Sequence, residues 1–281
     1  MFALPEVEVL RRDLEREVVG RRIRDVEVRP GSNAMKVIKR HGRRKEFRDL
    51  LVGARVDRVG RIGRRVVLGL DNGRSLVVDL GESALVLKTS TSDGLAPHTH
   101  IVVGFTIGGQ LRVVDPRLTG EVFVVGSGDL DGAHGLRPSA LDPLETPLAW
   151  QHFSSLLQNR AETMKELLMD EGFICGLGDV YSDEVLFVAG IRHDRPSDRL
   201  SSQDVRRLYR GLMETLQDAV RARGTSHGAN AFLDLEGKPG HFQLDLKVYE
   251  REGEPCRRCR HEIVRAASNG RFTYFCPQCQ T

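Results

Sequence analysis

The feature that most constrains the fold is a pair of Cys-x-x-Cys motifs near the C-terminal end of the sequence. The first is Cys256-Arg257-Arg258-Cys259 and the second is Cys276-Pro277-Gln278-Cys279, with sixteen residues between them. Two pairs at this spacing are typical of a four-thiolate zinc ribbon, because each pair sits on a tight turn and four soft ligands complete a tetrahedron. Two disulfides are the alternative, but nothing else in the sequence suggests secretion. One structural Zn²⁺ is therefore predicted, with ligands Cys256, Cys259, Cys276 and Cys279.

The segment between the two motifs has the pattern of a β-hairpin. Asn269-Gly270 is a favoured two-residue turn, and Phe272-Thr273-Tyr274-Phe275 is an aromatic and β-branched run that suits a strand. Arg265 and Arg271 make the hairpin basic. A rigid basic hairpin is often a nucleic-acid-binding device, so the sequence favours a nucleic-acid partner.

Composition limits the class of protein. The chain has 281 residues, of which 40% are hydrophobic and 29% charged, enough for two domains or one domain with an appendage. The net charge is only +3, so a nucleic-acid site must depend on where the charges are placed. We find no charged-then-apolar leader and no apolar run long enough for a bilayer, which predicts a cytoplasmic protein without a membrane partner. The fifth cysteine, Cys175, is predicted to be a small buried apolar residue.

The first half of the chain is predicted to be one helix followed by strands. Residues 4–19 have apolar side chains at helical spacing, and Gly20 suits a left-handed stop. Residues 22–125 contain short apolar runs and Gly-rich turns, which favour a β-sandwich or barrel. Asp71-Asn72-Gly73 is predicted to be a hairpin turn. The basic run 39–45 is predicted to be a connection, and a solvated charge run is favoured there over a phosphate-binding loop.

The second half is predicted to be helical up to the zinc motif. One helix should follow Gly176-Leu177-Gly178-Asp179 and end at Gly190. Another should begin at Ser201, with Asp204 completing a capping box, and end at Gly224. The fold class is thus multi-domain α+β. The predicted boundaries are a β-sandwich domain with flanking helices at 1–130, a linker at 131–149, a helical domain at 150–250 and a zinc-ribbon hairpin at 251–281.

Several longer motifs occur in register with the zinc ribbon. They are Asp115-Pro116-Arg117, Gly176 to Glu184 with Leu186-Phe187, Gly237-Lys238-Pro239-Gly240, Gly253-Glu254-Pro255-Cys256, and Arg271. Together these motifs resemble the formamidopyrimidine-DNA glycosylase/endonuclease VIII family of base-excision repair enzymes, over essentially the whole chain. The resemblance implies a β-sandwich and a helix–two-turn–helix domain flanking a DNA groove. It also implies a monomer in a bacterial-type cytoplasm, associated with the nucleoid and with damaged or abasic duplex DNA as partner.

The resemblance also implies which residues contact DNA. A helix N-terminus with Gly176 and Gly178 would present backbone N–H groups to a phosphate, and Arg271 would contact phosphates around an extruded nucleotide. For Lys165 an ordinary helix-surface role is the alternative. His98 and His100 match a His-x-His pair of the family, and we assign them no metal. The predicted DNA-binding residues are Arg64, His98, Arg117, Lys165, Gly178, Asp179 and Arg271.

The catalytic positions of the family differ in this chain. Family members begin Met-Pro-Glu-Leu-Pro-Glu; after methionine removal the proline amine attacks the sugar and forms a Schiff base, and the glutamate acts as the acid. Here the sequence is Met1-Phe2-Ala3-Leu4-Pro5-Glu6, so Phe2 and Ala3 replace those two residues. The nitrogen of Phe2 is in a peptide bond while Met1 is retained, and Ala3 has no proton to transfer. No catalytic residue is therefore assigned.

Other lesion-handling positions differ as well. The replacements are Arg64 for a lysine, Asp79 for a histidine, Glu82 for a methionine, Thr119 for a phenylalanine and Asp179 for an asparagine, while Arg117 is kept. A charged Glu82 inserted into a base stack would be costly unless it were paired. These replacements lie where the resemblance places contacts to the lesion, so they support the loss of the family chemistry.

Three functions are compatible with this pattern. We favour a protein that binds damaged or abasic DNA without the proline-dependent glycosylase and lyase chemistry. The second is an active glycosylase or AP lyase in which Glu6, Glu8 or Asp179 activates a water, or the amine of Met1 forms an imine. The third is a zinc-stabilised scaffold for a protein partner.

Overall fold

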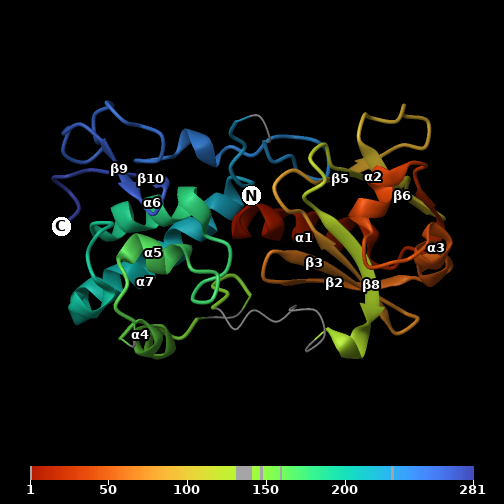
Figure 1. Cartoon of the computed structure of the whole chain (residues 1–281), viewed down its shortest axis with the longest axis horizontal. Helices are drawn as coiled ribbons and strands as arrows, with labels where there is room; N and C mark the ends of the chain where they lie inside the picture. The colour runs from red at the N-terminus through yellow and green to blue at the C-terminus, as the bar shows by residue number, and fades with distance from the viewer. Residues whose placement is uncertain (1, 131–140, 146–147, 159, 229–230) are drawn as a thin grey trace. The chain divides into compact units, whose positions relative to one another are not determined.

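The computed structural model describes residues 2–130, 141–145, 148–158, 160–228 and 231–281. The chain divides into two compact units (Figure 1). Unit 1 comprises Met1–Arg137 and Ala222–His241, and unit 2 comprises Pro138–Arg221 and Phe242–Thr281. The segment Ala222–His241, which the sequence groups with the helical domain, is thus part of the compact unit that contains the N-terminal region.

Unit 1 contains two antiparallel four-stranded sheets, as the sandwich prediction requires. One sheet has the order β1-β6-β7-β5 and the other β2-β3-β4-β8. The strands are β1 (Ile23–Val28), β2 (Val56–Ile62), β3 (Arg65–Leu70), β4 (Arg74–Asp79), β5 (Leu85–Thr89), β6 (Thr99–Phe105), β7 (Gln110–Val114) and β8 (Glu121–Gly126). The predicted hairpin is β3–β4, and Gly73 supplies the positive φ of +76° that its turn needs. Val67, Val77 and Phe123 form a buried cluster in the second sheet.

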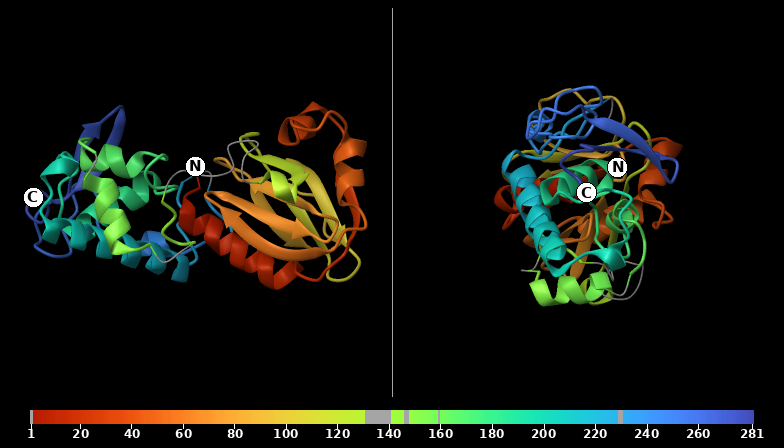
Figure 2. Two further views of the ribbon diagram at one scale, coloured as in Figure 1. Left: turned by 90° about the horizontal axis from the view of Figure 1, so that it is seen from below. Right: turned by 90° about the vertical axis from the view of Figure 1, so that its left-hand side faces the viewer.

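Three α-helices accompany these sheets. The predicted N-terminal helix is α1 (Leu4–Val18), which lies along β2 and β3 (Figure 2). The sequence did not predict α2 (Ser32–Val37) or α3 (Arg44–Leu51) within the strand-rich region. The prediction that the basic run 39–45 is only a connection was wrong at its end, since α3 begins at Arg44. Phe47 and Leu51 bury one side of this helix at i, i+4 spacing, a short period that the surrounding charges obscured.

Unit 2 is helical as predicted up to Arg221, where its last α-helix ends; between Phe242 and the zinc motif the described residues contain only a 3₁₀ turn. Its α-helices are α4 (Trp150–Gln158), α5 (Met164–Met169), α6 (Gly178–Ala189) and α7 (Ser202–Arg221). Helix α6 ends at Gly190, which has a left-handed φ of +69°. The capping box before α7 also forms, because Asp204 Oδ2 accepts from Ser201 N at 2.9 Å and Ser201 Oγ accepts from Asp204 N at 3.2 Å. Single 3₁₀ turns occur at η1 (Ser127–Asp129) in unit 1 and at η2 (Ser197–Arg199) and η3 (Phe242–Leu244) in unit 2.

The predicted zinc hairpin is β9 (Val264–Ser268) paired with β10 (Arg271–Phe275). Its turn residues Asn269 and Gly270 have φ values of +47° and +73°, as a type I′ turn requires. Among the helices in the described part of the chain, none has the length and apolar composition needed to cross a membrane.

Candidate nucleic-acid interface and metal centre

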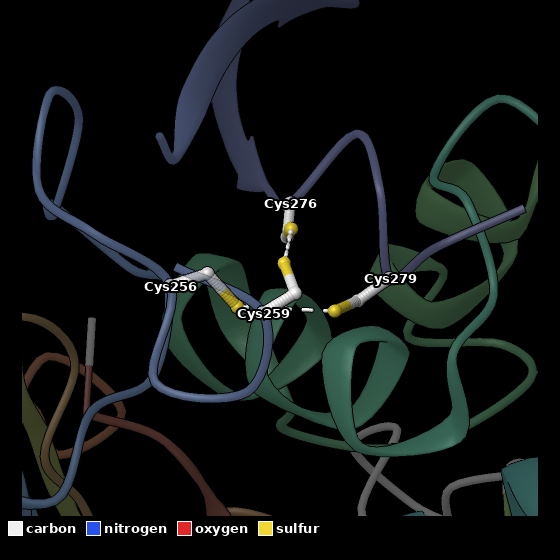
Figure 3. A group of neighbouring side chains, drawn as sticks. All are labelled: Cys256, Cys259, Cys276 and Cys279. Atoms are coloured by element: carbon white, nitrogen blue, oxygen red, sulfur yellow. Dashed lines mark hydrogen bonds between the residues drawn. The ribbon is translucent and has the colours of Figure 1, made fainter. Parts of the chain in front are cut away.

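Four cysteines converge below the β9–β10 hairpin (Figure 3). The sulfurs of Cys256, Cys259, Cys276 and Cys279 all lie within 4.8 Å of one another. The Sγ atoms of Cys259 and Cys276 are 3.4 Å apart, and those of Cys256 and Cys279 are 3.9 Å apart. A tetrahedral zinc–thiolate site requires roughly 3.8 Å between sulfurs, so the cysteines already have the geometry of a metal site.

The surroundings of the sulfurs also suit a cation. Burial raises the pKa of Cys256, but hydrogen bonds from the backbone N–H groups of Cys259 and Arg258 outweigh it and lower this pKa to about 7. Burial and the neighbouring thiols raise the pKa of Cys279. Four thiolates can share this space only with a positive ion between them, which zinc supplies. These cysteines form one structural zinc site, as predicted.

The zinc site is attached to helix α6. Phe187 of α6, Val248 and Ile263 pack with Cys256 and Cys276 in one buried cluster. The guanidinium of Arg258 donates to the carbonyl of Phe187 at 2.8 Å and lies 4.3 Å from the centre of its ring. Loss of the metal should therefore disturb the C-terminal end of α6.

Lys165 has surroundings that the sequence did not reveal. It is 2% exposed, so the alternative of a helix-surface lysine is wrong. Its Nζ lies 2.7 Å from Asp183 Oδ1, 2.7 Å from Ser182 Oγ and 3.1 Å from the carbonyl of Asp179. These three acceptors match the three donors of an ammonium group. The geometry favours a positioning role for Lys165, and its contact with DNA stays a prediction.

Asp183 joins Lys165 to the hairpin. Burial raises the pKa of Asp183, whereas the Lys165 ammonium and the hydrogen bonds that the carboxylate accepts lower it. Those bonds come from Thr273 Oγ1 at 2.5 Å and from the backbone N–H of Tyr274 at 2.9 Å. The buried Lys165–Asp183 pair thus fixes strand β10 against the N-terminal half of α6.

Asp183 and Glu184 are structural residues that sequence reasoning did not single out. Both Glu184 oxygens accept backbone N–H groups, those of Lys247, Val248 and Tyr249, at 2.9 to 3.0 Å. The signal was available in the sequence, since two adjacent acids occur among apolar residues in a helix. Buried carboxylates in such a place require partners.

Arg271 of β10 and Asp179 of α6 form an ion pair of 2.8 Å. The Arg271 side chain is 62% exposed and that of Asp179 is 30% exposed. Asp179 lies in the first turn of α6, where the free backbone N–H groups favour an anion. Gly178 has a φ of +62°, but an added Cβ would meet nothing within 4 Å. Glycine is thus needed here for the backbone conformation, and no described residue crowds the position.

The N-terminal segment of unit 1 buries Phe2. This residue is 7% exposed, and its ring packs edge-to-face on Phe232 with 5.6 Å between ring centres. Its backbone N–H donates to the carbonyl of Gly81 at 3.2 Å. The alternative that used the amine of Met1 concerns a residue outside the described part of the chain.

Ala3 and Glu6 begin helix α1. Ala3 is the N-cap and has no side-chain acceptor, while Glu6 Oε2 accepts the Ala3 N–H at 3.0 Å. Glu6 Oε1 accepts the backbone N–H of Thr225 at 2.7 Å. Glu6 is 3% exposed, so this carboxylate links α1 to the segment 222–241 within unit 1.

Glu8 is a buried anion surrounded by arginines. It accepts from Arg11 and Arg12, and Arg61 Nε lies 3.2 Å away. Burial alone raises the pKa of Glu8, but the Arg11 and Arg12 hydrogen bonds outweigh this effect and lower it. A carboxylate that is stabilised in its charged form and enclosed by cations is a structural group and a weak base.

Two loops of unit 1 meet at the buried carboxylate of Asp115. Ser83 Oγ donates to its Oδ1 at 2.5 Å, and the N–H of Gly120 donates to its Oδ2 at 2.8 Å. Thr119 Oγ1 accepts the N–H of Glu82 at 2.9 Å. The close approach of these loops excludes a side chain at Gly81, where a Cβ would lie 2.3 Å from the carbonyl of Thr119.

Three of the lesion-handling positions named by the resemblance, Glu82, Arg117 and Thr119, lie on these loops. Glu82 and Arg117 form an ion pair of 2.8 Å, with side chains 40% and 50% exposed, so the charge of Glu82 is paired. On the strand that leads into the first loop, Asp79 Oδ2 pairs with Arg65 Nε at 2.9 Å.

Arg64 and His98 are the other predicted DNA contacts in unit 1. Arg64 is half-buried in the turn between β2 and β3. His98 is exposed, with an unusual φ of +61°, and its carbonyl accepts the N–H of Asp115 at 3.0 Å. His100 is buried, and its Nε2 lies 2.9 Å from the carbonyl of Asp115. Their predicted contacts with DNA stay predictions, and the geometry gives His100 a structural role.

Three domain families match consecutive parts of the chain. They are the formamidopyrimidine-DNA glycosylase N-terminal domain at residues 1–122, the formamidopyrimidine-DNA glycosylase H2TH domain at 140–230, and a zinc finger found in FPG and IleRS at 253–281. A β-sandwich, a helix–two-turn–helix segment and a four-cysteine zinc finger together define a class of DNA-repair glycosylases. The chain belongs to the formamidopyrimidine-DNA glycosylase family.

Individual relatives agree with this membership over their full length. The chain is 34% identical to the formamidopyrimidine-DNA glycosylase of Pelotomaculum thermopropionicum, covering 100% of this chain and 99% of the relative. The enzyme of Salinispora arenicola is 36% identical, with 100% and 96% covered. The structure of the Thermus thermophilus protein has a TM-score of 0.84 at 33% identity, covering 99% and 98%. That of the Lactococcus lactis protein, in complex with DNA containing an abasic site, has a TM-score of 0.87 at 26% identity, covering 99% of each chain.

Proposed function

We propose that this protein binds damaged or abasic duplex DNA and does not carry out the proline-dependent glycosylase and lyase chemistry of its family. The observation that carries the proposal is the state of Phe2, which stands at the position of the nucleophilic proline. Its ring is buried against Phe232, and its nitrogen is an amide that donates to Gly81. An amide nitrogen has no lone pair available to attack a sugar carbon.

The residues proposed as catalytic substitutes are engaged in other interactions. Glu6 uses one oxygen for Ala3 and the other for Thr225, and Glu8 is surrounded by arginines. Asp179 pairs with Arg271. A general base needs a lone pair directed at a water and a pKa near the working pH. Both oxygens of Glu6 accept backbone N–H groups, and the arginines around Glu8 lower the pKa of its carboxyl. These interactions favour a protein that binds DNA without cleaving it over one in which Glu6, Glu8 or Asp179 acts as the catalytic base.

The binding half of the proposal rests on groups that remain suited to DNA. Arg271 is an exposed cation on a rigid hairpin, and it lies next to the first turn of α6. Arg117 is half exposed on its loop in unit 1. The Lactococcus lactis relative, whose structure is similar over the whole chain, was crystallised with abasic-site DNA. Arg64, His98, Lys165, Gly178 and Asp179 complete the set of proposed contacts.

Borohydride trapping and strand cleavage test the chemical half of the proposal. We expect no trapped adduct and no cleavage on duplexes that carry 8-oxoguanine, a formamidopyrimidine or an abasic site. The double variant Phe2→Pro with Ala3→Glu restores the family residues and serves as the matched comparison, and we expect it to form some trapped adduct. Robust trapping or cleavage by the unaltered protein would show that another nucleophile is active.

Binding is tested separately with the same duplexes. We expect retention of an abasic-analogue duplex in gel shifts at low salt, and weaker binding as salt rises, because phosphate contacts release counterions. No binding even at the lowest salt concentration would remove the DNA-binding proposal.

A further inference from the structure

The first turn of helix α6 and Arg271 together present donors that suit a phosphate, and acids of the chain itself already occupy two of them. Asp179 Oδ2 accepts from Arg271 Nη1 at 2.8 Å. Just before the helix, the backbone N–H of Gly176 donates to Glu171 Oε2 at 3.2 Å. Gly176 has a φ of +69°, a left-handed backbone conformation that favours glycine. Both contacts are within unit 2.

The position of Asp179 is fixed by the surrounding structure. Its carbonyl accepts from Lys165 Nζ and from Ser182 Oγ, each at 3.1 Å. Its side chain is only 30% exposed, whereas Arg271 is 62% exposed. Arg271 is thus the more exposed partner of the pair, and the backbone of Asp179 is held in the first turn of α6.

One oxygen of Asp179 has no compensating contact. Oδ1 is buried and has no hydrogen-bond partner among the described residues. A buried acceptor without a donor is costly, so the carboxylate is not optimised for the stability of unit 2. An amide at this position would keep the same shape and replace the unsatisfied oxygen with a group that can donate to a phosphate.

We propose that Asp179 and Glu171 determine the affinity of this site by standing in for phosphate on its donors, so that a DNA phosphate must displace them. The inference rests on the proposed DNA-binding function and concerns the same site. An approaching phosphate replaces Asp179 as the ion-pair partner of the Arg271 guanidinium. The Asp179 carboxylate then remains close to the negative phosphate and repels it. Because Arg271 is already neutralised, it adds little to the counterion release that drives binding.

The test uses full-length, zinc-loaded protein and a fluorescent duplex that contains a tetrahydrofuran abasic analogue. Binding is measured by anisotropy at several salt concentrations for the unaltered protein, Asp179→Asn and Glu171→Gln. We expect Asp179→Asn to bind about three- to tenfold more tightly at low salt. The slope of log K against log salt should also become steeper by about the amount that one additional phosphate contact contributes. Glu171→Gln should show a smaller gain.

The matched control is Asp194→Asn. Asp194 pairs with Arg192 at 3.1 Å, and both side chains are about half exposed, so the variant removes the same charge from unit 2 at another ion pair. We expect it to leave the salt slope unchanged. Equal effects of Asp179→Asn and Asp194→Asn on affinity and slope, or weaker binding by Asp179→Asn, would overturn the inference. The gain should also disappear when Arg271→Gln is added to Asp179→Asn.

A second measurement separates this inference from the proposed function. Inorganic phosphate is titrated while the Nε–H signal of Arg271 is followed by NMR. Asp179→Asn should respond at a lower phosphate concentration than the unaltered protein, whether or not the protein binds DNA. If the unaltered protein and Asp194→Asn fail to bind the duplex at the lowest salt, the proposed function fails and this titration alone decides the inference. Identical responses of Asp179→Asn and the unaltered protein would then refute it.

Discussion

The carboxylate of Glu82 lies 2.8 Å from the guanidinium of Arg117, on two neighbouring loops of unit 1. The loops are joined by Asp115, which accepts from Ser83 on one loop and from Gly120 on the other. The pair therefore belongs to a connected polar network and is not an isolated surface contact. It also neutralises an arginine that we propose as a DNA contact.

Removing the charge of Glu82 should strengthen DNA binding. In Glu82→Gln, Arg117 loses its anionic partner. We expect about two- to fivefold tighter binding of an abasic-analogue duplex at low salt, a factor that corresponds to the free energy of one exposed ion pair. Anisotropy measures the change, and Arg117→Gln in the same background should cancel it. Asp57→Asn is the control, because Asp57 pairs with Arg55 at 3.1 Å and is similarly exposed. An equal gain in that control would attribute the effect to net charge alone.

Loss of the zinc ligands should unfold the hairpin. We expect Cys276→Ser to lose the single zinc and the ordered structure of β9 and β10, since zinc binding contributes about 10 kcal/mol or more to folding in small zinc-finger peptides. Metal content per chain and the NMR dispersion of the hairpin amides measure both effects. Cys175→Ala is the control, because Cys175 is buried outside the cysteine cluster and should leave the metal in place. An ordered hairpin in metal-free Cys276→Ser would contradict the assignment of a structural metal.

Breaking the Lys165–Asp183 pair should destabilise unit 2 strongly. Lys165→Met leaves the Asp183 carboxylate buried without its cation, and we expect a loss of about 3–5 kcal/mol in the free energy of unfolding. Urea unfolding followed by the fluorescence of Trp150, the single tryptophan, reports on unit 2. Arg210→Met makes a similar change at a side chain that is 80% exposed and should cost little. A comparable cost in both variants would rule out a special role for the buried pair.

His41 should make the stability of unit 1 depend on pH. Its Nε2 accepts the backbone N–H of Val124 at 3.0 Å, so the ring must be neutral in the folded state. Burial lowers the pKa of His41, and Arg40 adds to this effect, while Glu46 and Glu121 oppose it.

The sign of this dependence follows from the lowered pKa. As pH falls below the unfolded value of about 6.5, the unfolded chain binds a proton that the folded protein resists, so stability decreases. We expect the Val124 amide to lose protection against hydrogen exchange over that range, after correction for intrinsic rates. His41→Gln keeps an acceptor without titrating and should remove the dependence. Constant protection of Val124 in the unaltered protein would refute the prediction.

Much of the fold and the metal centre could be predicted from local patterns. Asn269-Gly270 requires a tight turn, and Ser201 with Asp204 forms a cap, because each depends on atoms a few residues apart. Helices α2 and α3 were not predicted, since their buried faces are short and depend on contacts with β1, β6 and β8. A local sequence pattern does not predict a helix whose buried face forms only by packing against strands that are distant in the sequence.

The sequence by itself determined the zinc ligands, the family resemblance and the replacement of the family's proline and glutamate by Phe2 and Ala3. Only the tertiary structure decided what the charged residues do. It buried Lys165 against Asp183, paired Glu82 with Arg117 and placed Asp179 on Arg271. The physical reason is that metal-ligand spacing and turn conformation are local properties of the backbone. The partner of a charge is determined by packing between segments that are distant in the sequence; Asp183 and Tyr274, for example, are 91 residues apart.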